Sequence, residues 1–265
     1  MNKVSKTQAI IFFLMFCAVI SLKAQETSTT AHGALDAEAL KKANDPMAHT
    51  KAFNLHNYII TNIYGAPDYG ANQLMFRYAQ PVGKFLLRGT MPVMTSSGPG
   101  VGPKSGLGDF NLFAIYAIEK KGNKFGVGPL LTAPTGTNGF SSDKWQAGVA
   151  AMAFFASNPT LQTGALLQWQ TDFAGSSNAA DIDLLTAQLF GMWQIGGGTY
   201  LRSTGIWSFD LTNGNYSVPI GLGIGRVIKV GGVVFNIFAE PQFSVLAEGE
   251  GQSRFQVFVG FNTQF

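Results

Sequence analysis

Charged residues are scarce in this chain of 265 residues: 12% are Asp, Glu, Lys or Arg, about half the share usual for a soluble domain, whereas 46% are hydrophobic. A disordered chain has the opposite balance and is excluded. Of the 18 basic residues, Lys3, Lys6 and Lys23 lie near the start; the other 15 are matched by 15 acidic residues. The composition therefore excludes a basic nucleic-acid binder, and no nucleic-acid partner is expected.

Cysteine occurs only as Cys17, and the three histidines all lie before residue 57. Because Cys17 falls in a segment that we predict to be removed, the mature chain can have neither a disulfide framework nor a cysteine nucleophile. A Ser–His or Asp–His arrangement at an outer rim would need a histidine near an external loop, and none is placed there. The sequence therefore predicts no enzyme, no catalytic residue, no metal site and no cofactor.

The beginning of the chain is typical of a secretory signal peptide. A short cationic start precedes Ala9–Ile20, which are twelve consecutive apolar residues, and small Ala24 suits cleavage. Twelve residues are too few to span a bilayer. We predict a signal peptide over residues 1–24, a polar periplasmic N-terminal extension over residues 25–51, and a separate domain over residues 52–265.

Long apolar runs are also missing, since no later stretch reaches the roughly 18 residues of a membrane helix. Apolar and polar residues alternate instead, as in Gln162–Phe173, where Leu167 and Trp169 lie on one face and Gln168 and Gln170 on the other. Most such segments have eleven residues or more, and 12% charge cannot cover a soluble protein of this size. The apolar face is therefore predicted to contact lipid.

The connections between these segments alternate between short and long. The short ones are Pro81–Gly83, Lys120–Asn123, Ser157–Pro159, Gly196–Gly198 and Val230–Gly232, and the long ones are Thr95–Ser105, Thr135–Asp143, Ala174–Asp181, Leu211–Asn215 and Ala247–Ser253. Outer-membrane barrels have short periplasmic turns and longer outer loops. With a first strand over Phe53–Tyr64, the pattern predicts an all-β fold: a transmembrane antiparallel up-and-down β-barrel of about twelve strands in the bacterial outer membrane, with its lipid as a partner.

The last predicted strand ends in Phe265, and apolar residues, among them Phe261, occupy most alternate positions before it. This ending resembles the C-terminal signal that the outer-membrane barrel assembly machinery reads. We therefore predict that Phe261 and Phe265 act as an assembly signal and that this machinery is a partner.

By alternation, polar side chains should line the lumen of the barrel. The candidates are Gln73, Arg77, Arg88, Asp109, Lys144, Gln146, Gln168, Gln170, Asp172, Arg202, Asp210, Glu240, Gln242, Arg254 and Gln256. Twelve strands enclose a space between the packed interior of eight and the open channel of sixteen. The four arginines, set against Asp109 and Glu240, could line a selective path. Alternatively, these charges pair with one another and fill the lumen.

Two local features have more than one interpretation. In Tyr216–Lys229, a bulge near Gly223 or Gly225 would turn Arg226 inward; otherwise Arg226 lies near the periplasmic interface. The extension over residues 25–51 could enter the lumen as a plug or hang free in the periplasm. Its lack of an apolar anchor favours the second interpretation.

Six segments resemble a known family. In order they read AEALKKANDPMAHTKAF, QPVGKFLLRGTMPV, GLGDFNLFAIYA, GVGPLLTAPTGT, SDKWQAGVAA and VPIGLGIGRVIKVGG. They resemble bacterial outer-membrane proteins called neuromedin-U-like, which are related to the transporter group named after the meta-pathway of phenol degradation. The resemblance covers about Ala37–Phe265 and implies an outer-membrane barrel with a transport role. It adds no catalytic residues, because the family has no agreed ones.

These observations lead to two functional hypotheses. In the first, the barrel is a channel or transporter for the passive passage of a small molecule that the sequence does not identify. In the second, the barrel is sealed and structural, and its loops or its N-terminal extension bind partners.

Overall fold

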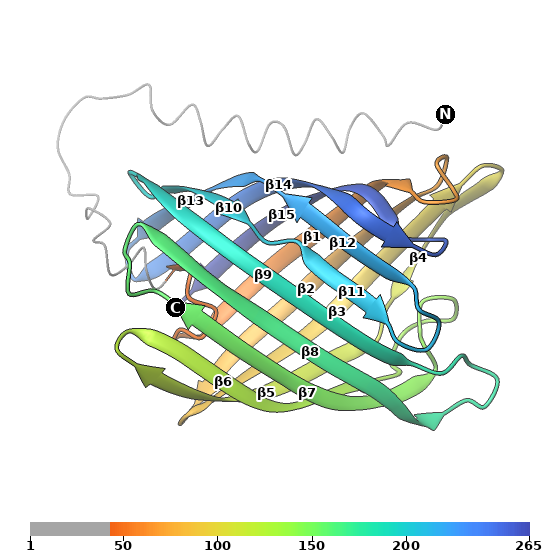
Figure 1. Ribbon diagram of the computed structural model, residues 1–265, viewed down its shortest axis with the longest axis horizontal. Coiled ribbons are helices and arrows are strands. Elements are labelled where there is room, and N and C mark those ends of the chain that lie inside the picture. Colours follow the sequence, from red (N-terminus) through yellow and green to blue (C-terminus); the bar gives the residue numbers. More distant parts are fainter. Residues whose placement is uncertain (1–42) are drawn as a thin grey trace. The chain divides into compact units, whose positions relative to one another are not determined.

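The computed structural model of this protein describes residues 43–265, and the predicted signal peptide and residues 25–42 of the predicted extension lie outside the described residues. Within this part of the chain, no helix has the length and apolar character needed to cross a membrane. Fifteen β-strands form one antiparallel sheet (Figure 1). They are β1 (Ala52–Ile63), β2 (Gly70–Val82), β3 (Phe85–Gly98), β4 (Val101–Leu107), β5 (Phe110–Lys120), β6 (Asn123–Ala133), β7 (Lys144–Phe155), β8 (Leu161–Gly175), β9 (Asp183–Gly196), β10 (Thr199–Ser203), β11 (Ile206–Asp210), β12 (Tyr216–Gly221), β13 (Gly223–Val230), β14 (Val233–Glu248) and β15 (Ser253–Gln264).

The sheet closes into a barrel because β15 pairs with both β14 and β1. Three long strands are each interrupted once: between β4 and β5, between β10 and β11, and between β12 and β13. The fifteen segments therefore make twelve barrel strands. This confirms the predicted up-and-down β-barrel and its strand number.

Tight turns join the strands at one end of the barrel, on the left in Figure 1, and longer connections join them at the other. We call these the short-turn end and the long-loop end. Gly83 and Gly231 in two of the tight turns have positive φ angles of 58° and 59°. Glycine adopts this conformation without the steric cost that a side chain imposes, which accounts for its presence in these turns.

The predicted long connection Thr95–Ser105 is a β-hairpin. β3 continues to Gly98 and β4 begins at Val101, so that the turn of the hairpin lies at Pro99 and Gly100. The composition suggested a loop because the residues are small and polar. Their backbone groups still require hydrogen-bond partners, however, and the two arms supply them to each other.

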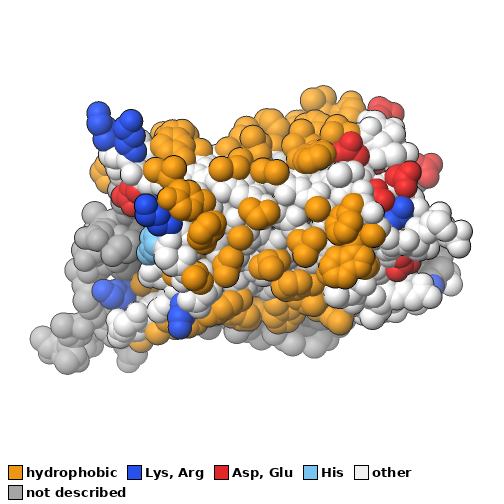
Figure 2. Space-filling view, turned by 90° about the horizontal axis from the view of Figure 1, so that it is seen from below, with side chains coloured by type: hydrophobic (Ala, Val, Ile, Leu, Met, Phe, Trp, Pro, Cys, Tyr) orange, Lys and Arg blue, Asp and Glu red, His pale blue; other side chains and the backbone are white. Residues whose placement is uncertain are grey.

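Large apolar side chains cover the outside of the barrel between its two ends. Examples with 39–56% exposure are Phe76, Val127, Leu131, Leu167 and Trp169. Figure 2 shows such side chains spread over the wall, with Lys and Arg gathered at one end and mostly Asp and Glu at the other. An apolar belt between two polar ends is the surface that a bilayer requires of a transmembrane barrel.

The neighbours Leu167 and Gln168 offer a test of this belt. Leu167 is 45% exposed on the outside, whereas Gln168 faces a cavity inside the barrel. Leu167→Arg should lower the yield of assembled barrel much more than Gln168→Arg, because a charge at mid-bilayer costs about 2–4 kcal/mol on the lipid side. Heat-modifiable gel mobility measures assembly, and equal yields for the two variants would refute the assignment of the two faces.

The orientation of the barrel can also be tested. Ser141 and Ser177 lie in connections at the long-loop end, and Asn158 lies in a turn at the short-turn end. In a Cys17→Ser background, cysteines at the first two positions should react with a bulky impermeant maleimide on intact cells, and a cysteine at Asn158 should react only after lysis. The reverse pattern would invert the barrel.

The alternation in Tyr216–Lys229 continues through the interruption between β12 and β13. Ile220, Leu222 and Ile224 are exposed on the outside, and the intervening glycines face inward. The register shift lies between Val218 and Pro219, not near Gly223 or Gly225. Arg226 therefore keeps the outer face, and it pairs with Thr199, the first residue after a tight turn, so it lies near the short-turn end.

The inward face is not polar throughout, contrary to the prediction. Phe113, Ile115 and Phe154 are almost completely buried and form an apolar cluster inside the barrel with side chains of β6, β8 and β9. Two-residue alternation missed this cluster because β5 is apolar on both faces. The cluster fills part of the lumen and confines any passage to the remaining polar part.

Candidate functional site

A buried ion pair lies in the lumen beside the interruption between β10 and β11, and it consists of Glu240 and Arg202. Glu240 on β14 has no exposed surface. Its Oε2 accepts hydrogen bonds from Arg202 Nε at 2.8 Å and Thr204 Oγ1 at 2.7 Å, and its Oε1 accepts from the Thr204 backbone N–H at 2.7 Å. The strand interruption frees this N–H from pairing between strands. Gly221 keeps the space open, because a Cβ there would lie 2.6 Å from Glu240 Oε1.

Neighbouring side chains extend this cluster. Gln242 Nε2 donates to Glu240 Oε1 at 3.0 Å, and Gln256 Nε2 donates to Gln242 Oε1 at 2.7 Å. The Arg202 guanidinium lies 3.4 Å from the centre of the Phe238 ring. For Arg202 and Glu240, the structure therefore favours the alternative in which the predicted lumen charges pair with each other. Gln242 adds a hydrogen bond to this pair and fills the space beside it.

Arg77 and Arg88 form a different arrangement, which we call the arginine pair. They lie on the neighbouring strands β2 and β3, diagonally opposite, since Arg77 is in register with Thr90 and Arg88 with Ala79. The Arg88 guanidinium lies 4.2 Å from the centre of the Phe113 ring. Among the residues that the structure describes, neither arginine forms an ion pair, and the Nε atom of each is buried without a hydrogen-bond partner.

His56 supports Arg77 without neutralising it. Arg77 Nη1 lies 2.9 Å from His56 Nδ1, and His56 Nε2 lies 2.8 Å from Asn262 Oδ1. If Nδ1 accepts from the arginine and Nε2 donates to the amide oxygen, the ring is the neutral tautomer. The arginine pair thus keeps both of its positive charges, and the sequence had given no role to His56.

Two cavities meet at the arginine pair. One, of about 150 Å³, extends toward the short-turn end past His56, Asn54 and Asn44. The other, of about 260 Å³, extends toward the long-loop end past Gln168, Gln170 and Asp109. Arg77 and Arg88 line both. They therefore lie where the two cavities adjoin.

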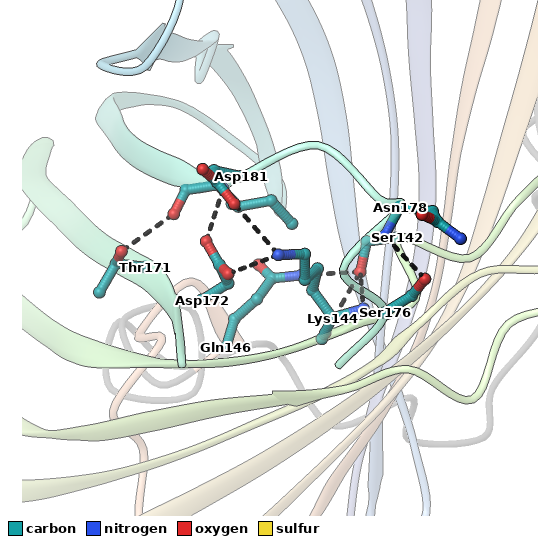
Figure 3. Close-up of polar contacts among 9 residues, drawn as sticks. Ser142, Lys144, Gln146, Thr171, Asp172, Ser176, Asn178 and Asp181 are labelled. Atoms are coloured by element: carbon teal, nitrogen blue, oxygen red, sulfur yellow. Dashed lines mark hydrogen bonds and ion pairs between the residues drawn. The ribbon is translucent and has the colours of Figure 1, made fainter. Parts of the chain in front are cut away.

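At the long-loop end, polar side chains hold the connections together. Lys144 Nζ lies 3.0 Å from Asp172 Oδ2 and 3.1 Å from Asp181 Oδ1, so that Lys144 joins β7 to β8 and to the β8–β9 loop (Figure 3). The other oxygen of Asp172 accepts from the Ile182 backbone N–H at 2.7 Å. Gln170 Nε2 donates to Gln146 Oε1 at 2.6 Å. These contacts hold β7, β8 and the β8–β9 loop together at the long-loop end.

Asp109 orders another connection at the long-loop end, and it forms no ion pair with the lumen arginines. It follows Gly108 in the interruption between β4 and β5, and it accepts hydrogen bonds from the backbone N–H groups of Gly136 at 3.0 Å and Ser142 at 2.8 Å and from the Ser142 hydroxyl at 2.5 Å. Partial burial alone would raise the pKa of Asp109, but these hydrogen bonds outweigh it and hold the pKa below its ordinary value.

The described part of the N-terminal extension packs inside the barrel, so the interpretation that it hangs free is wrong for these residues. Met47 is 2% exposed and belongs to the apolar cluster around Phe113. Asp45 pairs with Lys124 on β6 at 2.5 Å, and Asn236 on β14 donates to Asn44 Oδ1 at 2.9 Å. Burial raises the pKa of Asp45, although Lys124 opposes this shift. The sequence analysis overlooked Met47, which supplies the apolar anchor.

The remaining predicted residues lie at the edges of the site. Arg254 is exposed near the long-loop end, with its guanidinium 5.8 Å from the centre of the Tyr64 ring. Phe261 contacts Phe235 with ring centres 5.9 Å apart, and Phe265 is 55% exposed. Asp210, another lumen candidate, instead accepts hydrogen bonds from the backbone N–H groups of Thr212 and Asn213 in the loop that follows it.

Within residues 43–265 there is no group of three or more His, Cys, Asp or Glu placed to hold a metal.

Solved structures of outer-membrane proteins have a similar architecture. An outer membrane channel from Pseudomonas putida F1 superposes with a TM-score of 0.62 over 83% of this chain and 99% of its own, at 14% identity. The NanC porin superposes with a TM-score of 0.51 over 81% of this chain and 98% of its own, at 8% identity. At such low identity these likenesses show the fold alone.

The chain is a bacterial outer-membrane β-barrel. Its closed sheet, its apolar belt and its similarity to barrels of this membrane agree. No family model matches the sequence, and no curated protein does. What this outer-membrane barrel does must therefore be argued from its lumen.

Proposed function

We propose that this outer-membrane barrel is a channel for the passive passage of a small molecule. The observation that carries the proposal is the pair of cavities, of about 150 and 260 Å³, that meet at Arg77 and Arg88 and extend toward opposite ends of the barrel. A barrel with only a structural role has no need of two adjoining cavities that extend toward its opposite ends. Ion selectivity in channels commonly depends on charged side chains that line a narrow section.

The rival proposal is a sealed barrel. It is supported by the apolar cluster around Phe113, by the paired Arg202 and Glu240, and by the N-terminal residues packed near the short-turn end. These features narrow the lumen, but they lie beside the two cavities and leave them unfilled.

Liposome swelling with uncharged sugars of increasing size tests the channel proposal. Proteoliposomes that contain the barrel should swell with pentoses and fail to swell with large oligosaccharides, since the cavities are narrow. Swelling no faster than that of empty liposomes, for every solute, would favour the sealed barrel.

We also propose kinship with the neuromedin-U-like outer-membrane proteins. Three of the segments that carry the resemblance meet at one place: Asp109 of GLGD accepts hydrogen bonds from Gly136 of PTGT and from Ser142 of SDKW. A shared structural role for these segments supports the kinship. The C-terminal Phe265 with Phe261 remains our proposal for the signal that the barrel assembly machinery reads.

A further inference from the structure

The charge in the middle of the lumen is unbalanced. Three arginines, Arg77, Arg88 and Arg202, and a single carboxylate, Glu240, lie in the lumen between the two polar ends in the part of the chain that is described. Glu240 binds Arg202 directly, and the acidic groups near the long-loop end are engaged elsewhere, Asp172 by Lys144 and Asp109 by the loop backbone. Two guanidinium groups therefore remain without a counter-charge.

Three buried donors around this position lack an acceptor. They are Arg77 Nε, Arg88 Nε and the hydroxyl of Tyr58. Tyr58 is 5% exposed and is fixed by stacking on Phe258, with ring centres 4.3 Å apart and planes at 1°. It packs in one cluster with Met75, which lines the cavity of about 260 Å³ together with both arginines. Buried polar groups normally have partners, and a cluster of donors indicates that the missing partner is an acceptor.

A purely structural role does not account for the arginine pair. The same barrel satisfies Arg202 with a carboxylate, a threonine hydroxyl and an aromatic face. Among the described residues, Arg77 contacts only the neutral His56 ring and the Met75 sulfur, and Arg88 contacts the Phe113 ring. Two neighbouring cations without a carboxylate partner repel each other and destabilise the fold. A guanidinium group offers a planar set of donors that matches the two oxygens of a carboxylate.

We propose that Arg77 and Arg88 form an anion-binding constriction that favours small organic carboxylates, an inference that rests on the proposed channel function. The carboxylate group would lie between the two guanidinium groups. Leu86, Phe190 and Met192 line the cavity on the short-turn side and would accommodate a short apolar body. A cavity of about 150 Å³ is large enough for a molecule of the size of benzene, so the two volumes restrict the ligand to small molecules.

Reversal potentials in planar bilayers under a KCl gradient test the selectivity. The wild-type barrel should pass Cl⁻ in preference to K⁺, and the double variant Arg77→Gln/Arg88→Gln should lose this preference. The control Arg254→Gln removes one arginine charge at the exposed rim and should retain the preference. A cation-selective wild type, or a selectivity that the double variant leaves unchanged, would overturn the proposal.

Binding to the full-length barrel in detergent provides a readout that does not depend on conduction. Calorimetric titration should detect butyrate, and its uncharged analogue butyramide should not bind. The double variant should lose butyrate binding, and Arg254→Gln should keep it. Equal binding of the two compounds, or no binding of butyrate, would contradict the inference.

The two experiments together separate this inference from the channel proposal. Butyrate binding that depends on the arginine pair in a barrel that does not conduct would support the site and reject the channel. Conduction without anion preference or butyrate binding would support the channel and reject the site. The double variant Arg77→Gln/Arg88→Gln and the control Arg254→Gln should both fold, because each removes arginine charges that have no carboxylate partner among the described residues and retains side chains that form hydrogen bonds. Gel mobility would verify folding.

Discussion

Glu240→Gln should destabilise the assembled barrel more than a charge-neutralising substitution at any exposed acidic residue. Glu240 is completely buried and receives hydrogen bonds from Arg202, Thr204 and Gln242. Removal of its charge leaves Arg202 buried without a counter-ion, which costs about 3–5 kcal/mol. Urea unfolding of the refolded barrel, followed by gel mobility, measures the free energy of unfolding.

Two further variants identify the cause of this loss. Glu248→Gln makes the same chemical change at an exposed position of the same strand and should be nearly neutral. The double substitution Arg202→Met/Glu240→Leu should recover much of the loss, because replacing both partners of a buried pair leaves no unpaired charge. A Glu240→Gln barrel as stable as wild type would show that the cluster contributes little to the fold.

Deletion of residues 26–48 should raise single-channel conductance severalfold in a barrel that still folds. The deletion removes Asn44, Asp45 and Met47, which pack near the short-turn end, and Asn44 and Asp45 line the cavity there. The sheet closes through β1 and β15, so closure does not require this segment. Conductance in planar bilayers gives the result directly.

A shorter deletion is the matched control. Removal of residues 26–42 leaves Asn44, Asp45 and Met47 in place and should change conductance much less. A second control, Met47→Asp, places a charge in the apolar cluster and should release the segment, with an effect like that of the long deletion. Unchanged conductance in a well-folded barrel without residues 26–48 would mean that the packed segment does not limit the passage.

Strand number and lipid-facing side chains could be predicted from the sequence because they repeat. A side chain alternates faces at every residue, so segments such as Gln162–Phe173 identify the outside without any long-range information. The hairpin within the long connection Thr95–Ser105 was not predicted, since small polar residues suit a loop and an extended hairpin equally. The cluster around Phe113 was missed because an apolar inward face does not alternate with an apolar outward one.

Part of the lumen lining was predictable from the sequence, but the contacts among its residues were not. Alternation placed Arg77, Arg88, Arg202 and Glu240 inside, and the structure agrees. Pairing depends on which strands become neighbours and at what height, and residues far apart in the sequence, such as Arg202 and Glu240, meet only in the closed barrel. The packed extension was missed because its anchor is the single residue Met47, which forms no sequence pattern.

Single-channel recording of the wild-type barrel in planar bilayers tests the central claim most directly, because the claim is that the lumen is a passage. We predict discrete conductance steps that are small, since the two cavities that Arg77 and Arg88 line are themselves small. A folded, heat-modifiable barrel that shows no conductance steps, even after removal of residues 26–48, would contradict a channel and establish a sealed barrel.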